Sequence, residues 1–114
     1  MKNVQLTTRL KIHDGELNDF KARAAPCLTA VKENEIGALQ YDWFFNDDQS
    51  ECVIRESYKD SDSVLAHLAN VGVFLGKLFE VSDLSLEVFG TPSKELKTAI
   101  EAANPIIFPF YQGL

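Results

Sequence analysis

Alternating apolar and polar residues predict four β-strands. In residues 4–12 every second side chain is apolar, and polar ones lie between them, which is typical of a strand that buries one face. The same period of two recurs in residues 39–45, 52–58 and 84–89. The polar, turn-rich residues 46–50 separate the second and third runs, so these two strands should form an antiparallel hairpin.

Between the first two strands, apolar residues spaced three and four apart predict an amphipathic helix. Asp14 is placed to cap a helix that begins near Glu16, and Gly37 ends the element. Pro26 falls inside this helix and removes one backbone hydrogen bond, so we expect a kink or a break into two short helices.

A second helix should follow the hairpin, with Asp60 or Ser61 as its N-cap and a wide apolar face over residues 64–79. Gly72 and Gly76 weaken this helix, which predicts a bend or a restart after Asn70.

The last segment begins with Thr91 as a cap and Pro92 at the first helical position, which predicts a short third helix that stops at Asn104. The tail over residues 106–114 is apolar and aromatic, and Pro109 bars it from a central strand. Exposed aromatic side chains are costly, so we expect the tail to dock against a surface.

The order β-α-β-β-α-β is that of a ferredoxin-like α+β domain, with one antiparallel sheet and helices on one face. The hairpin carries large apolar groups on both faces: Tyr41, Trp43 and Phe45 on one and Phe44 on the other. Only one face can meet the helices. The sequence therefore predicts a homodimer that pairs sheet to sheet, and one place for the tail is across the partner.

Composition limits the classes of binding partner and the cellular compartment that we expect for this protein. The chain has 114 residues, enough for one domain, and a net charge of −6, which argues against nucleic acid and anionic membrane surfaces as partners. The longest apolar stretch, residues 71–79, contains Lys77 and is too short to cross a bilayer. No apolar leader is visible, and Cys27 and Cys52 are far apart, so we expect reduced thiols in a cytoplasmic protein.

The hairpin and the helix after it resemble the antibiotic biosynthesis monooxygenase (ABM) family of dimeric α+β barrels. The resemblance rests on Gly37 with Tyr41, on Glu56 with Tyr58, and on His67 in the helix. It covers residues 4–89 and implies an ABM-like domain over residues 1–90. Residues 91–114 would then be an added helix and tail, packed on the same domain or on the dimer partner.

The resemblance implies a cofactor-independent monooxygenase that oxidises a small aromatic quinol or polyketide-like substrate with O₂. Two other functions stay open. One is a non-catalytic small-molecule-binding or scaffold protein of the same fold, and the other is an isomerase or lyase on the same barrel. Relatives that degrade haem use a histidine late in the second helix, where this chain has residues 77–80 and no histidine, so haem is not expected.

His67 is the first candidate catalytic residue, because a histidine at the edge of an apolar helix face can deprotonate a phenol or hydroquinone. The resulting anion can donate an electron to O₂ without a metal. Glu56 is the candidate that orients this histidine. The alternative is a structural histidine bonded to Glu56 or to the backbone, with Glu56 serving a cap or a dimer contact.

Trp43, Tyr41 and Tyr58 are candidates for a flat aromatic substrate pocket, although aromatic residues in strands more often belong to a core or an interface. Asn70 projects beside His67 and is a candidate donor to a substrate oxygen. The two histidines and the carboxylates follow no known metal-binding spacing, so we expect neither a metal nor another cofactor.

Overall fold

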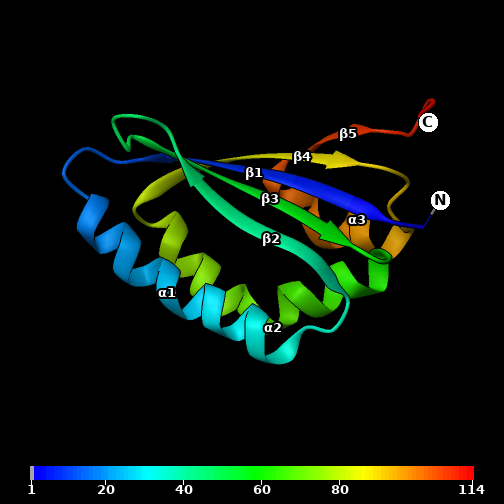
Figure 1. Ribbon diagram of the computed structural model, residues 1–114, viewed down its shortest axis with the longest axis horizontal. Coiled ribbons are helices and arrows are strands. Elements are labelled where there is room, and N and C mark those ends of the chain that lie inside the picture. The colour runs from blue at the N-terminus through cyan, green and yellow to red at the C-terminus, as the bar shows by residue number, and fades with distance from the viewer. Residues whose placement is uncertain (1) are drawn as a thin grey trace.

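The computed structural model describes residues 2–114 and has the α+β fold that the alternation of apolar residues predicts (Figure 1). In chain order the elements are β1 (Val4–Ile12), α1 (Leu17–Asn34), β2 (Ala38–Phe45), β3 (Glu51–Tyr58), α2 (Ser61–Phe79), β4 (Ser82–Phe89), α3 (Lys94–Ile100), the short 3₁₀ helix η1 (Glu101–Ala103) and β5 (Ile106–Phe108).

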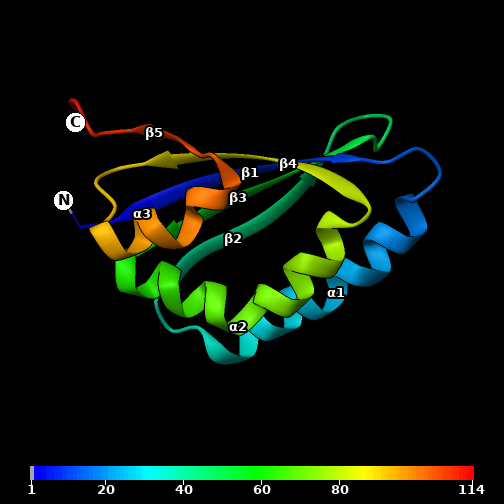
Figure 2. The same cartoon turned by 180° about the vertical axis from the view of Figure 1, so that it is seen from behind.

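The strands form one sheet in the order β2-β3-β1-β4-β5. The first four are antiparallel to their neighbours, as predicted for a ferredoxin-like domain, and β5 adds a parallel edge strand beside β4. The three α-helices cover one face of this sheet, and within residues 2–114 no helix lies on the other face (Figure 1, Figure 2). The ferredoxin-like fold is therefore confirmed.

Two apolar clusters fill the space between sheet and helices. One contains Leu10, Ile12, Phe20, Ala24, Cys52, Ile54, Leu78 and Val81, and the other contains Val4, Leu6, Tyr58, Val64, Val88, Leu96 and Ile100. Five buried polar side chains belong to neither cluster, and three of them, Thr8, Glu56 and His67, line the cavity described below. Thr8, Glu56 and His67 form a group in the core. Each occupies a chain position between members of the two clusters, so a polar band divides the core.

Both long helices are continuous, and the predicted breaks are wrong. Pro26 lies inside the single helix α1, whose inward face buries Phe20, Ala24, Cys27 and Val31. Helix α2 likewise runs through Gly72 and Gly76 without a restart. Inside a helix, a glycine costs about 1 kcal/mol and a proline about 3 kcal/mol relative to alanine. Burial of the apolar face of each helix against the sheet offsets this cost.

One of the predicted caps is confirmed and two are wrong. The Asp60 carboxylate accepts the Ser63 amide at 2.8 Å and caps α2. Asp14 does not cap α1, because Glu16 holds the N-cap position and makes no side-chain cap. Ser93, not Thr91, caps α3. The Ser93 hydroxyl accepts from the Leu96 amide at 3.1 Å, and the Ser93 amide donates to the Ser61 hydroxyl at 2.9 Å.

The start of the tail docks on the domain itself as the edge strand β5. The ring of Phe108 stacks on Phe89 with 5.2 Å between centroids, and Pro109 follows the strand directly. Gly90, at the turn after β4, has φ of 122° and donates to the Phe108 carbonyl. A Cβ at this position would lie 2.9 Å from the Asn3 carbonyl oxygen, so the turn needs glycine.

Candidate active site

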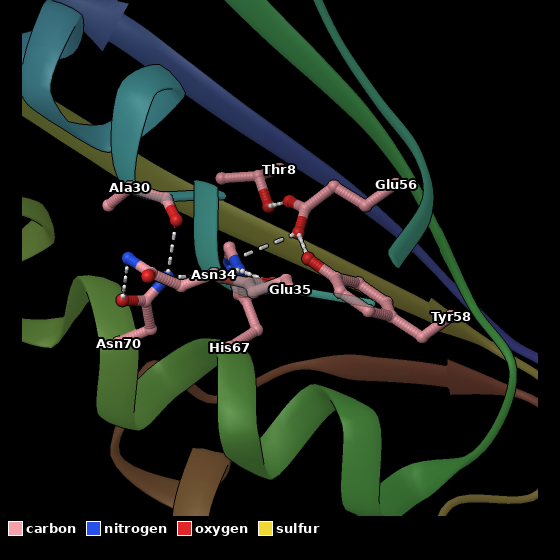
Figure 3. A network of polar contacts seen from close by, with 8 residues as sticks. All are labelled: Thr8, Ala30, Asn34, Glu35, Glu56, Tyr58, His67 and Asn70. Carbon is pink, nitrogen blue, oxygen red and sulfur yellow. Dashed lines mark hydrogen bonds and ion pairs between the residues drawn. The ribbon is translucent and has the colours of Figure 1, made fainter. Parts of the chain in front are cut away.

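The inward faces of β1 and β3 place Thr8 and Glu56 side by side (Figure 3). The Thr8 hydroxyl donates to Glu56 Oε2 at 2.7 Å, and the Tyr58 hydroxyl donates to Glu56 Oε1 at 2.7 Å. Glu56 is only 4% exposed. Burial is the largest influence on this carboxyl and raises its pKa, against the opposing effect of His67 and the two hydroxyl donors. Burial thus favours the neutral form of the Glu56 carboxyl more than water does.

His67 projects from α2 into the polar band and is 2% exposed. Its Nδ1 lies 2.9 Å from Glu35 Oε1 and 3.0 Å from Glu35 Oε2, whereas its Nε2 lies 3.6 Å from Glu56 Oε1. A carboxylate accepts hydrogen bonds, so Nδ1 donates to Glu35 and Nε2 is directed toward Glu56. The imidazole therefore lies between two buried carboxyl groups.

Glu35 follows the last residue of α1, and its side chain is 4% exposed. Asn70 holds it in place: Nδ2 of Asn70 donates to Glu35 Oε2 at 2.8 Å and to the Ala30 carbonyl at 2.9 Å (Figure 3). Asn34 in turn donates to Asn70 Oδ1 at 3.4 Å. These bonds connect the end of α1 to the middle of α2 behind the imidazole.

Sequence reasoning missed Glu35. The hydrogen-bond partner that orients His67 is Glu35, whereas Glu56, the residue predicted for that role, faces the other ring nitrogen. One signal was available in the sequence. An acidic side chain just after a helix opposes the helix dipole, and such a residue needs a compensating partner elsewhere.

A cavity of about 350 Å³ lies between the sheet, α2 and the α3–η1 segment. Its polar lining comes from Thr8, Tyr41, Glu56 and His67. The remaining lining is apolar: Leu6, Ile54, Val64, Leu68, Leu75, Phe79, Leu84, Leu86, Ala99, Ile100, Ala102 and Ala103. An apolar cavity with a few converging polar groups is the usual form of a small-molecule site.

Tyr41 lines the cavity, and its ring centroid is 5.1 Å from that of His67. Burial raises its pKa, so the hydroxyl stays protonated. Within residues 2–114 the Tyr41 hydroxyl and the Trp43 indole N–H are buried and have no hydrogen-bond partner. Trp43 itself packs on Phe20, with 6.4 Å between centroids, and is not among the cavity-lining residues.

Two other candidates lie behind the cavity wall. Tyr58 is fully buried and donates to Glu56 from the side. Asn70 does not line the cavity, because its amide is bonded to Glu35 and to Ala30. The expectation that Asn70 donates to a substrate oxygen therefore gives way to a role in holding Glu35.

Across residues 2–114, no group of three or more histidine, cysteine, aspartate or glutamate side chains has the arrangement of a metal site. The second histidine, His13, forms an exposed pair with Asp83 at 2.9 Å, far from His67 in the sequence. Within the same residues no helix has the length and apolarity needed to cross a membrane.

Three of the solved structures that share this fold serve as examples. MupZ from Pseudomonas fluorescens is 24% identical, with a TM-score of 0.86 over 100% of this chain and 94% of that chain. SnoaB, a cofactor-independent oxygenase from Streptomyces nogalater, is 18% identical, with a TM-score of 0.68 over 82% of this chain and 97% of that chain. Rv0793 from Mycobacterium tuberculosis is 17% identical, with a TM-score of 0.70 over 81% and 97%.

At these identities the solved structures establish the fold alone. No curated protein matches the sequence. The family profile described as antibiotic biosynthesis monooxygenase matches residues 4–73, which is more than half of the chain and includes Tyr41, Glu56 and His67. The chain belongs to the antibiotic biosynthesis monooxygenase family.

Proposed function

We propose that the protein is a cofactor-independent monooxygenase that oxidises a small aromatic quinol or polyketide-like substrate with O₂. The observation that carries this proposal is the placement of His67 between Glu35 and Glu56 at the wall of an apolar cavity. Family membership supports the class of reaction, as does the description of SnoaB as a cofactor-independent oxygenase.

In the proposed reaction, Nε2 of His67 takes a proton from the substrate. The imidazolium that forms is balanced by the Glu35 carboxylate, which keeps its hydrogen bond to Nδ1 at 2.9 Å. The substrate anion transfers an electron to O₂, and the two radicals combine to a peroxide anion at the reacting carbon. The His67 imidazolium returns its proton to this anion, which gives a hydroperoxide. Loss of water from this hydroperoxide leaves a carbonyl, so one oxygen atom enters the product and the other leaves as water.

Glu56 and Tyr41 have complementary roles in this proposal. Glu56, whose pKa is raised, supplies the proton that the departing water needs, and it is reprotonated by the proton that the reacting carbon loses as the carbonyl forms. Tyr41 has a protonated hydroxyl without a partner among residues 2–114, so it is free to donate to a substrate oxygen. Trp43 and Tyr58 support the wall from behind and keep the aromatic side chains in place.

The outer face of the sheet supports a homodimer. Phe44, Phe89 and Phe108 are exposed by 54%, 36% and 43%, and Phe44 and Phe89 border one hollow on the sheet. A second copy that pairs with this face would cover them.

The two free cysteines, Cys27 and Cys52, are buried, and their pKa values of about 11 fit unreactive thiols in a cytoplasmic protein.

A second candidate function is proton transfer without oxygen, as in an isomerase or lyase. The observation that favours it is the 3.6 Å separation of His67 Nε2 and Glu56 Oε1, which puts a base and a protonated acid at one wall of the cavity. Such a pair can remove a proton from one atom of a substrate and return it to another. A non-catalytic binding protein would use the same cavity without needing either group.

Oxygen uptake distinguishes these functions. It is measured for the purified, chelator-treated protein with a panel of hydroquinones and anthrones. If the protein is a monooxygenase, it takes up oxygen and His67→Ala abolishes the uptake. The control His13→Ala changes an exposed histidine and should leave the uptake intact. Conversion of substrate without oxygen uptake would support the isomerase or lyase. Uptake that His67→Ala leaves unchanged would rule out the proposed base.

A further inference from the structure

The segment α3–η1 borders the cavity, although it lies entirely beyond the family match, which ends at residue 73. It contributes Ala99, Ile100, Ala102 and Ala103 to the lining. Figure 2 shows α3 beside α2 on the helix-covered face of the sheet. This chain therefore completes its cavity with a wall that the matched part of the domain does not supply.

The wall is made of small side chains at the solvent edge. Ala99 and Ala102 line the cavity and are also exposed, so they lie at its mouth, whereas Ile100 between them is buried and anchors the segment. The reacting groups Glu56 and His67 are both nearly fully buried. A ligand that enters past the alanines thus has its leading end at the polar band and its trailing end at the rim.

The cavity lining also restricts the charge of the ligand. Within residues 2–114 no lysine or arginine lines the cavity, whereas Glu56 does and Glu35 lies directly behind His67. A carboxylate or phosphate in this space would lose its hydration and meet no lysine or arginine, and it would be repelled by Glu56. A neutral molecule with a single polar end matches the four polar side chains, which are Thr8, Tyr41, Glu56 and His67.

We propose that Ala99 and Ala102 form a size-selecting rim, and that the substrate is a neutral molecule with one polar reacting group and an apolar body whose length the rim limits. This inference rests on the proposed function for the identity of the reacting end. The rim itself is a matter of ligand binding, and it can be tested without turnover.

The test uses 4-n-alkylphenols from propyl to heptyl as probes, with binding measured by calorimetry. In the wild-type protein each added methylene should tighten binding by about fourfold until the alkyl chain fills the cavity, and beyond that length the affinity should no longer increase. In Ala99→Leu and Ala102→Leu this limiting length should be shorter by at least one carbon. The affinity of both variants for propylphenol should stay within about twofold of the wild-type value. Leucine keeps the helical propensity, and both sites are exposed, so the fold should persist.

Ala22→Leu, at an exposed position of α1 away from the cavity, is the matched control and should keep the wild-type length dependence. A 4-alkylbenzoate should bind at least tenfold more weakly than the phenol with the same chain. Three results would overturn the proposal: an unchanged length dependence in both rim variants, equal or tighter binding of the benzoate, or no binding of any alkylphenol. Binding that follows the prediction without oxygen uptake would count against the monooxygenase alone.

Discussion

Glu35 and His67 are 32 positions apart in the sequence and meet at 2.9 Å in the fold. The contact joins the end of α1 to α2, and Asn70, three positions after His67, fixes the carboxylate from the other side. The ring is thereby held with one nitrogen committed to protein and the other directed to the cavity side. A base that keeps one orientation needs no rearrangement when it takes a proton.

The first prediction concerns the charge of Glu35. Glu35→Gln keeps the size of the side chain and an oxygen that can accept from Nδ1, but it removes the negative charge that balances the imidazolium. A positioned base contributes about 10²–10⁴-fold to a rate, so we expect kcat to fall by at least about tenfold. KM should change less than about twofold, because Glu35 does not line the cavity.

Glu33→Gln is the control for this experiment, since Glu33 is exposed near the end of the same helix. Steady-state kinetics of oxygen uptake by the three proteins would give the comparison. A rise in KM with kcat unchanged would assign Glu35 to substrate binding and contradict a role through His67.

The second prediction concerns pH and Glu56. The pKa of this glutamate is raised in the folded protein above its ordinary value of 4.5, so the folded state binds the proton more tightly than the unfolded state. Its contribution to the free energy of unfolding is therefore complete below pH 4.5 and is lost as the pH rises through the folded pKa. Glutamine resembles the protonated acid and does not titrate.

We therefore expect the free energy of unfolding of Glu56→Gln, relative to wild type, to increase between pH 4.5 and 8, by at most about 1.4 kcal/mol per pH unit. Urea denaturation at several pH values would measure the difference. Glu95→Gln, at an exposed position of α3, shows the effect of losing a charge alone. A difference that stays flat or decreases with pH would show that the buried carboxyl is held as an anion.

The sequence predicted the parts of the site that depend on periodicity. Alternation in β1 and β3 sets which side chains face the helices, so the inward position of Glu56 follows from its neighbours Ile54 and Tyr58. The position of His67 at the edge of an apolar helix face follows in the same way. These features are local, and a pattern of a few residues determines them.

The contacts of Glu35 and Asn70 could not be predicted in this way. They depend on how α1 and α2 pack against each other, and no local pattern states which residue at the end of one helix meets the middle of another. The caps show a related limit. Ser93 rather than Thr91 caps α3, and its amide also bonds to Ser61, a residue 32 positions earlier. The cavity wall from α3–η1 likewise depends on where that segment packs.

The third prediction compares two buried tyrosines on the inward face. The Tyr41 hydroxyl has no partner within residues 2–114, so Tyr41→Phe should leave the free energy of unfolding unchanged or raise it by about 1 kcal/mol. Tyr58→Phe removes a 2.7 Å bond to Glu56 and should lower it by about 1–3 kcal/mol. Each variant is the control for the other, because both delete one hydroxyl from the same region.

Thermal melts would show the contrast as a gap of several degrees between the two variants, at about 4 °C per kcal/mol. Equal losses in both variants would mean that the Tyr41 hydroxyl also has a stabilising partner. In the oxygen-uptake assay only Tyr41→Phe should raise KM directly, because Tyr41 lines the cavity and Tyr58 does not.

The fourth prediction tests the outer face of the sheet. Phe44 is 54% exposed in a hollow that Arg9, Arg55 and Phe89 also line, so a second copy paired with this face would bury its ring. Phe44→Lys should then shift the protein from dimer to monomer in sedimentation velocity at micromolar concentration, because burial would strip the ammonium of water beside the like charges of Arg9 and Arg55. Val73→Lys is the control, since Val73 is 73% exposed on α2, on the opposite side of the sheet, and should leave the dimer intact. A wild-type protein that sediments as a monomer at this concentration would refute the predicted homodimer, and the exposed aromatic side chains would then need another partner.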